Sequence, residues 1–447
     1  MKASKPTEQK LNARQAAERV ARTLREQGFQ AYFVGGCVRD LLRGTEPKDY
    51  DVATDATPPQ VQELFPRSLA VGAQFGVVIV LEDGHPIEVA TFRNDGLYTD
   101  GRRPIEVSFS NDPREDVLRR DFTVNGLLLD PATGEVLDFV EGQKDLKRRI
   151  IRAIGNSERR FEEDRLRMLR AVRFAAWLDY EIDAETFAAI HRLSAKIVSV
   201  SAERVRDELL RILTSGHARR GFELLDAAGL LDKILPEIAA MKGVEQPPQY
   251  HPEGDVWIHT MLMLEALPSK CSPTLALGVL LHDVGKPPTF RVAPDRIRFD
   301  NHVPVGMRMA EEICRHLRLS QGEAAQVVSL VEHHLRFRDV SKMRESTLKR
   351  FLRLPKFEEH LELHRLDCLS SHRNLENYEF VRSRLAALTE EEIRPPRLMT
   401  GDDLIQMGYP PGSRFKEILQ AVEDAQLEGE ISSRDEAMKF VQEHFPS

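Results

Sequence analysis

The chain is 447 residues long, with 41% hydrophobic and 30% charged residues, which predicts a soluble protein of about two to four packed domains. Its 63 Lys and Arg residues against 71 Asp and Glu residues give a formal net charge of −8. That total alone argues against a nucleic-acid binder, because phosphate neutralisation requires positive surface. No stretch approaches the roughly 18 apolar residues of a membrane span. The polar N-terminus and four scattered cysteines suggest neither a secretory signal nor a disulfide framework, so we expect a cytoplasmic protein.

The first third of the chain mixes strand and helix patterns. Helical spacing marks residues 14–27, which end at Gly28. Strand patterns follow at residues 31–34, 77–81, 87–91 and 136–140. From residue 157 onward nearly every segment is helical in pattern, with Pro- and Gly-rich breaks at 243–252, 287–288 and 395–396. We therefore expect an α+β fold with an α/β head and a long all-α body.

Two glycines lie between the strand at 31–34 and the helix expected after it. Gly35 and Gly36 leave room for main-chain N–H groups to approach a phosphate, and a helix start adds a favourable dipole. Arg39, one turn into that helix, can reach the same phosphates with a bidentate guanidinium. A plain strand-to-helix turn produces the same glycine pair, so the glycines indicate a phosphate site only in combination with other motifs.

A pair of aspartates lies shortly after Arg39. Asp49 and Asp51 share one face if residues 48–52 form a strand, because side chains alternate along a strand. Two adjacent carboxylates repel each other unless a divalent cation lies between them, which indicates Mg²⁺ and two-metal attack on a nucleotide α-phosphate. Glu88 is a candidate third carboxylate. A solvated acidic turn and an ordinary edge-strand Glu are the alternatives.

These residues belong to an ordered series of motifs. The series resembles that of class II tRNA nucleotidyltransferases and bacterial poly(A) polymerases, which implies a polymerase β-like nucleotidyltransferase head. The matching segments are residues 34–44 with 48–51 (first motif), 88–93 (strand), 96–104 (flexible loop), 118–125 (second motif) and 163–173 (nucleotide-selecting motif). The resemblance implies nucleotide binding by residues of these motifs: Gly35, Gly36, Arg39, Arg120, Asp121 and Asn125.

The nucleotide-selecting motif can also be read from its chemistry. Asp164, Arg167 and Arg170 are spaced three residues apart on an expected helix and so lie near one face. An Asp acceptor beside an Arg donor matches the polar edge that cytosine and adenine share. The resemblance implies base selection by these residues, helped by Arg173. The alternative is a ladder of ion pairs on a helix surface.

The charge of this region differs from the total. Residues 144–220 contain 18 Lys and Arg against 12 Asp and Glu, a net charge of +6 within the acidic chain. That excess suits a triphosphate and an RNA end. Part of it can also belong to solvated helix faces.

The helical body contains a second group of candidate ligands. In chain order these are His259, His282, Asp283 and Asp367. Polar residues in apolar helices need partners, and a metal supplies them; imidazole with carboxylate suits Mn, Fe, Ni or Co. The order resembles the HD phosphohydrolase superfamily, whose binuclear members imply His302 and His333 as further ligands. With 14 histidines in the chain, a chance match is the alternative.

Four parts are expected along the chain. They are a nucleotidyltransferase head (residues 1–150), a helical neck for nucleotide selection and RNA binding (151–245), an HD phosphohydrolase-like domain (246–375) and a helical tail (376–447). The tail resembles a segment that cradles the tRNA elbow, and a purely structural helix pair is the alternative.

The resemblance implies template-independent addition of CCA, from CTP and ATP, to the 3′ end of tRNA, with Mg²⁺ at the head and a transition metal at the HD site. An additional HD phosphohydrolase activity is a hypothesis. Within the family the alternatives are A-only addition and poly(A) synthesis; residues 69–88 lack the Gly-Arg-Arg-Phe pattern of the bacterial poly(A) polymerases. From another class, the head could be a non-catalytic RNA-binding module. No membrane partner is expected, and the oligomeric state stays open.

Overall fold

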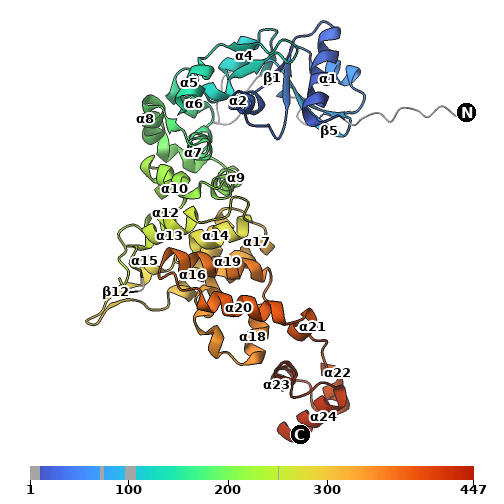
Figure 1. Ribbon diagram of the computed structural model, residues 1–447, viewed down its shortest axis with the longest axis vertical. Helices are drawn as coiled ribbons and strands as arrows, with labels where there is room; N and C mark the ends of the chain where they lie inside the picture. Colours follow the sequence, from blue (N-terminus) through green and yellow to red (C-terminus); the bar gives the residue numbers. More distant parts are fainter. Residues whose placement is uncertain (1–10, 71–74, 96–106, 250, 447) are drawn as a thin grey trace, which may run out of the picture. The chain divides into compact units, whose positions relative to one another are not determined.

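The computed structural model describes residues 11–70, 75–95, 107–249 and 251–446 (Figure 1). The expected flexible loop at 96–104 lies outside the described residues. The chain divides into two compact units, Met1–Pro236 and Glu237–Ser447, and the finer four-part division stays a prediction. Within the described ranges, none of the helices has the length and apolar character needed to cross a membrane.

The first unit is built on a mixed seven-stranded sheet, in the order β3-β4-β5-β2-β1-β8-β9. Its strands are β1 (Ala31–Val34), β2 (Asp51–Thr54), β3 (Ser68–Leu69), β4 (Val77–Glu82), β5 (His85–Thr91), β8 (Leu127–Leu129) and β9 (Val136–Asp138). Shorter pairs are β6 (Arg93–Asp95) with β7 (Val107–Phe109) and β10 (Ile150–Ile151) with β11 (Glu181–Ile182). The sheet, followed by helices, confirms the predicted α+β class.

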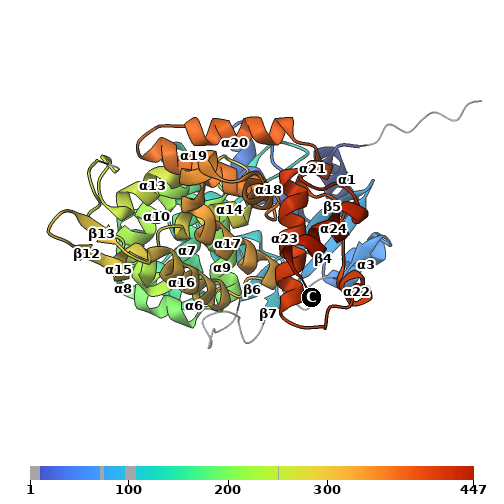
Figure 2. The same ribbon diagram turned by 90° about the horizontal axis from the view of Figure 1, so that it is seen from below.

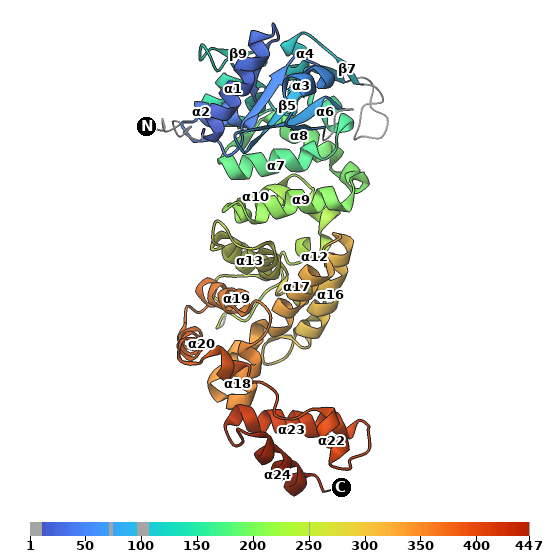
Figure 3. The same cartoon turned by 90° about the vertical axis from the view of Figure 1, so that its right-hand side faces the viewer.

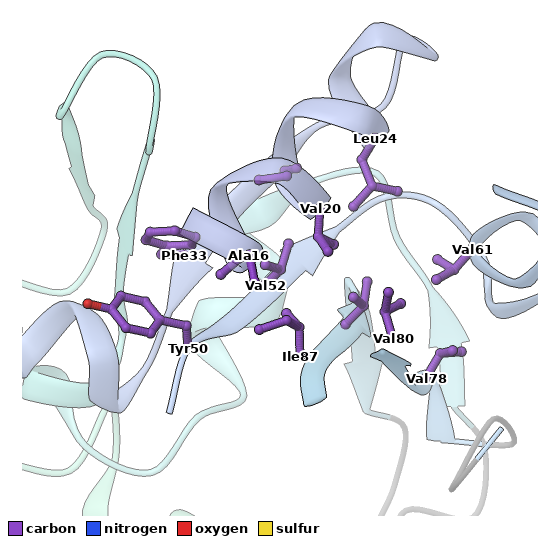
Figure 4. Close-up of a cluster of buried hydrophobic side chains, with 14 of the residues drawn as sticks. Ala16, Val20, Leu24, Phe33, Tyr50, Val52, Val61, Val78, Val80 and Ile87 are labelled. Atoms are coloured by element: carbon purple, nitrogen blue, oxygen red, sulfur yellow. The ribbon is translucent and has the colours of Figure 1, made fainter. Parts of the chain in front are cut away.

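One amphipathic helix anchors the centre of this sheet. Helix α1 (Ala13–Glu26) begins with a capping box between Asn12 and Gln15. Its apolar face, which includes Val20 and Leu24, packs on Val52 of β2 and Ile87 of β5 in one buried cluster (Figure 4). The core therefore holds β2 and β5 side by side, and these strands position the acidic residues.

The remaining helices of the first unit are α2 (Gly36–Leu42), α3 (Pro58–Leu64), α4 (Pro113–Leu118), α5 (Gly142–Arg148), α6 (Ser157–Glu163), α7 (Arg167–Leu178), α8 (Ala184–Leu193), α9 (Ala202–Leu213), α10 (Ala218–Ala227) and α11 (Leu231–Ile234). Of these, α2–α4 lie between strands of the sheet in chain order and α5–α11 follow its last strand. Helix α7 packs against both α9 and α10 (Figure 3).

The structure corrects one expected helix. Residues 163–173 do not form a continuous helix, because the chain is extended at Asp164 between α6 and α7 (φ −143°, ψ 104°). The Asp164 carboxylate accepts a hydrogen bond from the Leu166 N–H at 3.1 Å. A short acidic side chain that bonds its own backbone in this way competes with helix formation.

The second unit is almost entirely helical. Its helices are α12 (Pro236–Ala239), α13 (Val256–Glu265), α14 (Pro273–Leu281), α15 (Lys286–Thr289), α16 (His302–His316), α17 (Gln321–His333), α18 (Glu345–Leu352), α19 (Phe357–Ser370), α20 (Glu376–Ala387), α21 (Glu390–Ile393), α22 (Gly401–Gln406), α23 (Arg414–Glu428) and α24 (Arg434–His444). A hairpin of β12 (Phe290–Val292) and β13 (Ile297–Phe299) follows α15 (Figure 2). Helices α13, α14, α17 and α19 pack together, and α22–α24 share a separate apolar cluster.

A close backbone contact fixes α15 against α16. A Cβ atom on Gly285 would lie 2.1 Å from the His302 carbonyl oxygen and 2.6 Å from the Gly306 nitrogen. Backbone atoms cannot yield as a flexible side chain can, so only glycine fits at this position. Gly285 follows Asp283 by two residues, and the contact therefore holds Asp283 near the start of α16.

We expect Gly285→Ala to lower the free energy of unfolding of the second unit by about 1–3 kcal/mol, because overpacking forces the backbone apart. The measurement is the urea unfolding transition followed by circular dichroism. Gly322→Ala in α17 is the matched control: its new Cβ meets nothing within 4 Å, so the change should be neutral or stabilise by up to about 1 kcal/mol. Equal shifts in both variants would contradict the steric explanation.

Candidate functional site

Two acidic residues lie opposite each other on neighbouring strands of the first unit. Strands β2 and β5 are parallel, and Asp51 pairs in register with Glu88. Asp49 lies two residues before β2 and is exposed, so the expected strand begins later than residue 48. The pKa of Asp51 is raised to about 6, mainly by burial; the Glu88 and Asp49 carboxylates act in the same direction and Arg120 opposes them. A divalent cation would relieve this crowding of negative charge, so the residues fit a hard metal ion.

The glycine turn lies beside two guanidinium groups. Gly35 has a φ of +74°, which favours glycine, and a Cβ there would lie 3.4 Å from Arg120 Nη1. A Cβ on Gly36 would lie 3.6 Å from Arg39 Nη2. The two absent side chains thus leave a space bordered by positive charge, which has the chemistry of a phosphate site.

Arg39 itself is more constrained than the sequence indicates. Its side chain is buried, donates to Asp40 at 2.9 and 3.0 Å, and donates to the Asn125 side-chain oxygen at 2.8 Å. The guanidinium also lies over the Trp177 ring at 4.9 Å. Arg39 therefore lies beside the glycine turn, but its guanidinium already donates hydrogen bonds to Asp40 and Asn125.

The residues of the second motif and the selecting motif form a connected network. Asp121 accepts from Arg170 at 2.6 and 2.9 Å and from Asn125 at 3.3 Å. Arg173 pairs with the buried Glu208 at 2.5 Å. These pairs join elements distant in the sequence, so they are not the solvated ladder along one helix that was the alternative. Asp121, Asn125 and Arg170 form one group, which we call the Asp121 network.

Burial alone would raise the pKa of Asp121, but the Arg170 guanidinium overcomes that effect and lowers it to about 2. Asn125 and Arg167 act in the same direction. Asp121 is therefore ionised at neutral pH and holds Arg170 in place.

The other two selecting residues also have protein partners. Asp164 accepts from Arg204 of α9 at 2.8 Å. Arg167 donates to Glu163 at 3.1 Å and to the Arg119 carbonyl oxygen at 3.0 Å. The structure brings Asp164 and Arg167 to the adjoining ends of α6 and α7 rather than to one helix face.

Sequence reasoning missed three members of these networks. Asp116, almost fully buried, accepts from both Arg119 and Arg120 at 2.6 and 2.9 Å. Asp116 precedes these arginines by three and four residues, and this spacing on a helix predicts ion pairs from the sequence alone. Arg204 and Glu208 offered no such signal, because their partners lie about 35–40 residues away.

The second unit gathers four histidines and two aspartates, which we call the histidine cluster: His259, His282, His302, His334, Asp283 and Asp367. Three of the imidazoles are fixed in the same way, since Nδ1 of His282, His302 and His334 lies 2.7–2.9 Å from a main-chain carbonyl oxygen. A carbonyl only accepts, so each Nδ1 carries the proton and each Nε2 keeps its lone pair. This is the tautomer that binds a metal through Nε2.

The inward-facing atoms of the cluster lie close together. Two sets of ligand atoms each fall within 4.8 Å: His259, His282 and Asp367, and Asp283, His302 and His334. Asp283 Oδ1 and the four Nε2 atoms are buried without a hydrogen-bond partner among the described residues. Buried lone pairs cost free energy unless they find a partner, and a divalent cation would supply one. The donor set fits a transition metal.

His334, rather than the predicted His333, lies in the cluster. His333 Nδ1 lies 2.9 Å from the Ser329 carbonyl oxygen, and its ring is 5.8 Å from that of His360. Consecutive residues at a helix end point in directions about 100° apart, so only one of the pair can face the cluster. Burial lowers the pKa of His334 to about 4, which keeps it in the neutral, ligating form.

A cavity of about 500 Å³ opens onto the cluster. His302, His334 and Asp367 line it together with the basic side chains of Lys286, Arg296, Arg298 and Arg338. Lys286 also contacts Asp283 Oδ2 at 2.7 Å and Gln246 at 2.6 Å. Positive groups beside candidate metal ligands favour an anionic substrate.

Comparison with known protein families finds matches to segments in both units. Three family models match: the poly A polymerase head domain (residues 31–152), a probable RNA- and SrmB-binding site of polymerase A (179–242) and the HD domain (255–369). Over these ranges the chain is similar to the head and RNA-binding segments of poly A polymerases and to HD domains.

The curated proteins that the chain resembles include CCA-adding enzymes. That of Bacillus pumilus is 43% identical over 215 residues, 48% of this chain and 54% of the relative. That of Lactobacillus helveticus is 40% identical over 252 residues, 55% of this chain and 62% of the relative. The chain spans about half the length of the curated relatives it matches. The Bacillus stearothermophilus CCA-adding enzyme in complex with CTP is similar in structure: TM-score 0.71, 27% identity, 97% of this chain and 99% of that one.

We expect Arg170→Met to cost about 3–5 kcal/mol of stability, because it leaves Asp121 buried without its cation. The double variant Asp121→Asn/Arg170→Met should recover at least half of the loss. Lys196→Met, which removes an exposed pair with Glu162, is the control and should cost at most about 1 kcal/mol. Urea unfolding of the four proteins gives these differences, and equal losses in Arg170→Met and the double variant would contradict the explanation.

The Asp121–Arg170 ion pair predicts that the free energy of unfolding depends on pH. The folded pKa of Asp121, about 2, lies below the ordinary value of about 3.9, so its contribution is complete above pH 4 and disappears as pH falls toward 2. The measurement is urea unfolding of wild type and Asp121→Asn from pH 2 to 7. A stability difference that did not shrink below pH 4 would contradict the ion-pair explanation.

Proposed function

We propose that the chain adds CCA to the 3′ end of tRNA, using CTP and ATP. The observation that carries the proposal is the register of Asp51 with Glu88 beside the Gly35–Gly36 turn. Asp51, Asp49 and Glu88 would hold Mg²⁺, which when bound would supply Lewis-acid stabilisation of the negative charge on the phosphates. The glycine turn and Arg120 would orient the triphosphate so that its α-phosphate faces the RNA 3′-hydroxyl.

Base selection is assigned to the residues where the head meets the following helices. Asp164 would accept from the base and Arg167 would donate to it in place of their protein partners Arg204 and Glu163. The Asp121 network and the Arg173–Glu208 pair would hold the surrounding helices in place. Residues 151–245 would then serve nucleotide selection and RNA binding, 246–375 the HD site and 376–447 the tRNA. The names of the relatives favour CCA addition over A-only addition and poly(A) synthesis. A cytoplasmic location belongs to the same proposal.

The test incubates the protein with tRNA lacking its 3′ end, tRNA ending in CC, and an unrelated RNA, each with labelled CTP and ATP. Addition of C, C and A to the first substrate is expected, and gel electrophoresis reads it directly. Addition of A alone, a long A tail, or no product would overturn the proposal.

Asp51→Asn should lower the rate of addition by roughly 1,000-fold, equivalent to about 4 kcal/mol of lost transition-state stabilisation. The matched control is Glu82→Gln on the neighbouring strand β4, whose carboxylate pairs with Arg19 and should leave the rate unchanged. Similar losses in both variants would show that folding, not metal binding, is affected.

A second activity is favoured by the orphaned atoms of the histidine cluster and the basic cavity beside them. We propose that this site is a metal-dependent phosphoesterase that uses Mn²⁺, Ni²⁺, Co²⁺ or Fe²⁺. Lys286 and the cavity arginines would bind the phosphate, while the inward Nε2 atoms and Asp283 hold the cation. When bound, such a cation would supply Lewis-acid activation of water and phosphate at this site.

His334→Ala should lower phosphoesterase activity by more than roughly 100-fold, since losing a ligand costs at least as much as losing its supporting partner. His333→Ala, one residue away, should leave activity within twofold. Activity is measured on 2′,3′-cyclic and terminal phosphate substrates with each metal, and a chelator should abolish it. Loss of activity in His333→Ala alone would contradict the assignment.

A further inference from the structure

His259 differs from the other histidines of the cluster in what holds it. Nδ1 of His282, His302 and His334 faces a main-chain carbonyl, whereas Nδ1 of His259 lies 2.7 Å from the carboxylate of Glu253. His259 Nε2 faces the cluster and lies 3.2 Å from Asp367 Oδ1. The imidazole therefore has a negative charge on the side opposite the nitrogen that would bind a cation.

Glu253 joins this histidine to a second one. The same oxygen, Oε1, lies 2.9 Å from Nδ1 of His251, and the two rings are 5.0 Å apart and nearly perpendicular. His251 lines the cavity that opens onto the cluster, while His259 is fully buried. Glu253 thus connects a buried candidate ligand to the wall of the substrate cavity.

The Glu253 carboxylate lies at hydrogen-bond distance from both imidazoles. A separation of 2.7–2.9 Å between an imidazole nitrogen and a carboxylate oxygen is that of a shared proton. The carboxylate is therefore a partner of the two imidazoles. Ligand atoms of His251, Glu253 and His259 also lie within 4.8 Å of one another, so the metal stoichiometry in the test below distinguishes a hydrogen-bond partner from a ligand.

From this geometry we infer that Glu253 is a positioning residue for the HD metal centre. Its carboxylate fixes the Nδ1–H tautomer of His259, increases the electron density at Nε2 and holds His251 at the cavity wall. Carboxylate–imidazole–metal arrangements strengthen a ligand in this way. The inference rests on the proposed metal binding by the histidine cluster.

The test measures metal affinity directly, without relying on activity. Full-length wild type, Glu253→Ala and Glu253→Gln are stripped with a chelator and titrated with Mn²⁺ and Ni²⁺ by calorimetry, with thermal unfolding of each metal-free protein as a second measurement. Glu253→Ala should bind roughly 10–100-fold more weakly, and Glu253→Gln, whose amide oxygen still accepts, should lose less. Glu359→Gln is the matched control: this Glu accepts from Ser272, Thr274 and Gln326 in the same unit.

The outcomes separate the inference from the function on which it rests. If wild type binds neither metal, the proposed metal centre itself fails. If wild type binds and Glu253→Ala matches Glu359→Gln in affinity, only the positioning role is overturned. A fall in stoichiometry by one ion at unchanged affinity would make Glu253 a ligand and would also overturn it. A lower melting temperature of the metal-free protein with unchanged metal affinity would show a purely structural role.

Discussion

A carboxylate or imidazole removed from water loses several kcal/mol of hydration, which only a hydrogen bond, an ion pair or a bound cation replaces. The two units meet this constraint differently. In the first, Asp121, Asp116 and Glu208 are each satisfied by arginines of the same chain. In the second, Asp283 Oδ1 and the four Nε2 atoms of the histidine cluster have no hydrogen-bond partner among the described residues and face one another instead. The first pattern builds a rigid frame, and the second leaves a place for a ligand.

The arginine networks explain how the head can be ordered around a polyanion site before any nucleotide arrives. Arg39 and Arg120 border the glycine turn, yet each is held by an acidic neighbour, Asp40 or Asp116. Holding long side chains in advance lowers the conformational entropy that binding would otherwise cost. The same contacts keep cationic groups close together without a counter-ion from solvent.

Much of this was predictable from sequence, and the limits have physical causes. Short runs rich in apolar and β-branched residues located β1, β4, β5 and β9, because such runs suit strands packed within a sheet. The order of motifs indicated the same kinds of protein that the comparisons found, from residues that local chemistry constrains. Sequence spacing failed at Asp164, where a side chain bonding its own backbone ended a helix, and at His333, where one residue of helix phase decides which imidazole faces inward. Arg204 and Glu208 were missed because tertiary packing alone brings them to their partners.

The contact at Gly285 has a consequence for how this unit can change. Main-chain atoms of the α15 start and of α16 touch there, so the spacing between Asp283 and His302 does not depend on the volume of any side chain. Apolar residues elsewhere in the unit can be exchanged and repacked without altering that spacing. Sequence changes in the hydrophobic core of the second unit should therefore have little effect on the spacing of these candidate metal ligands. The cost is one position, Gly285, at which any side chain meets main-chain atoms of α16.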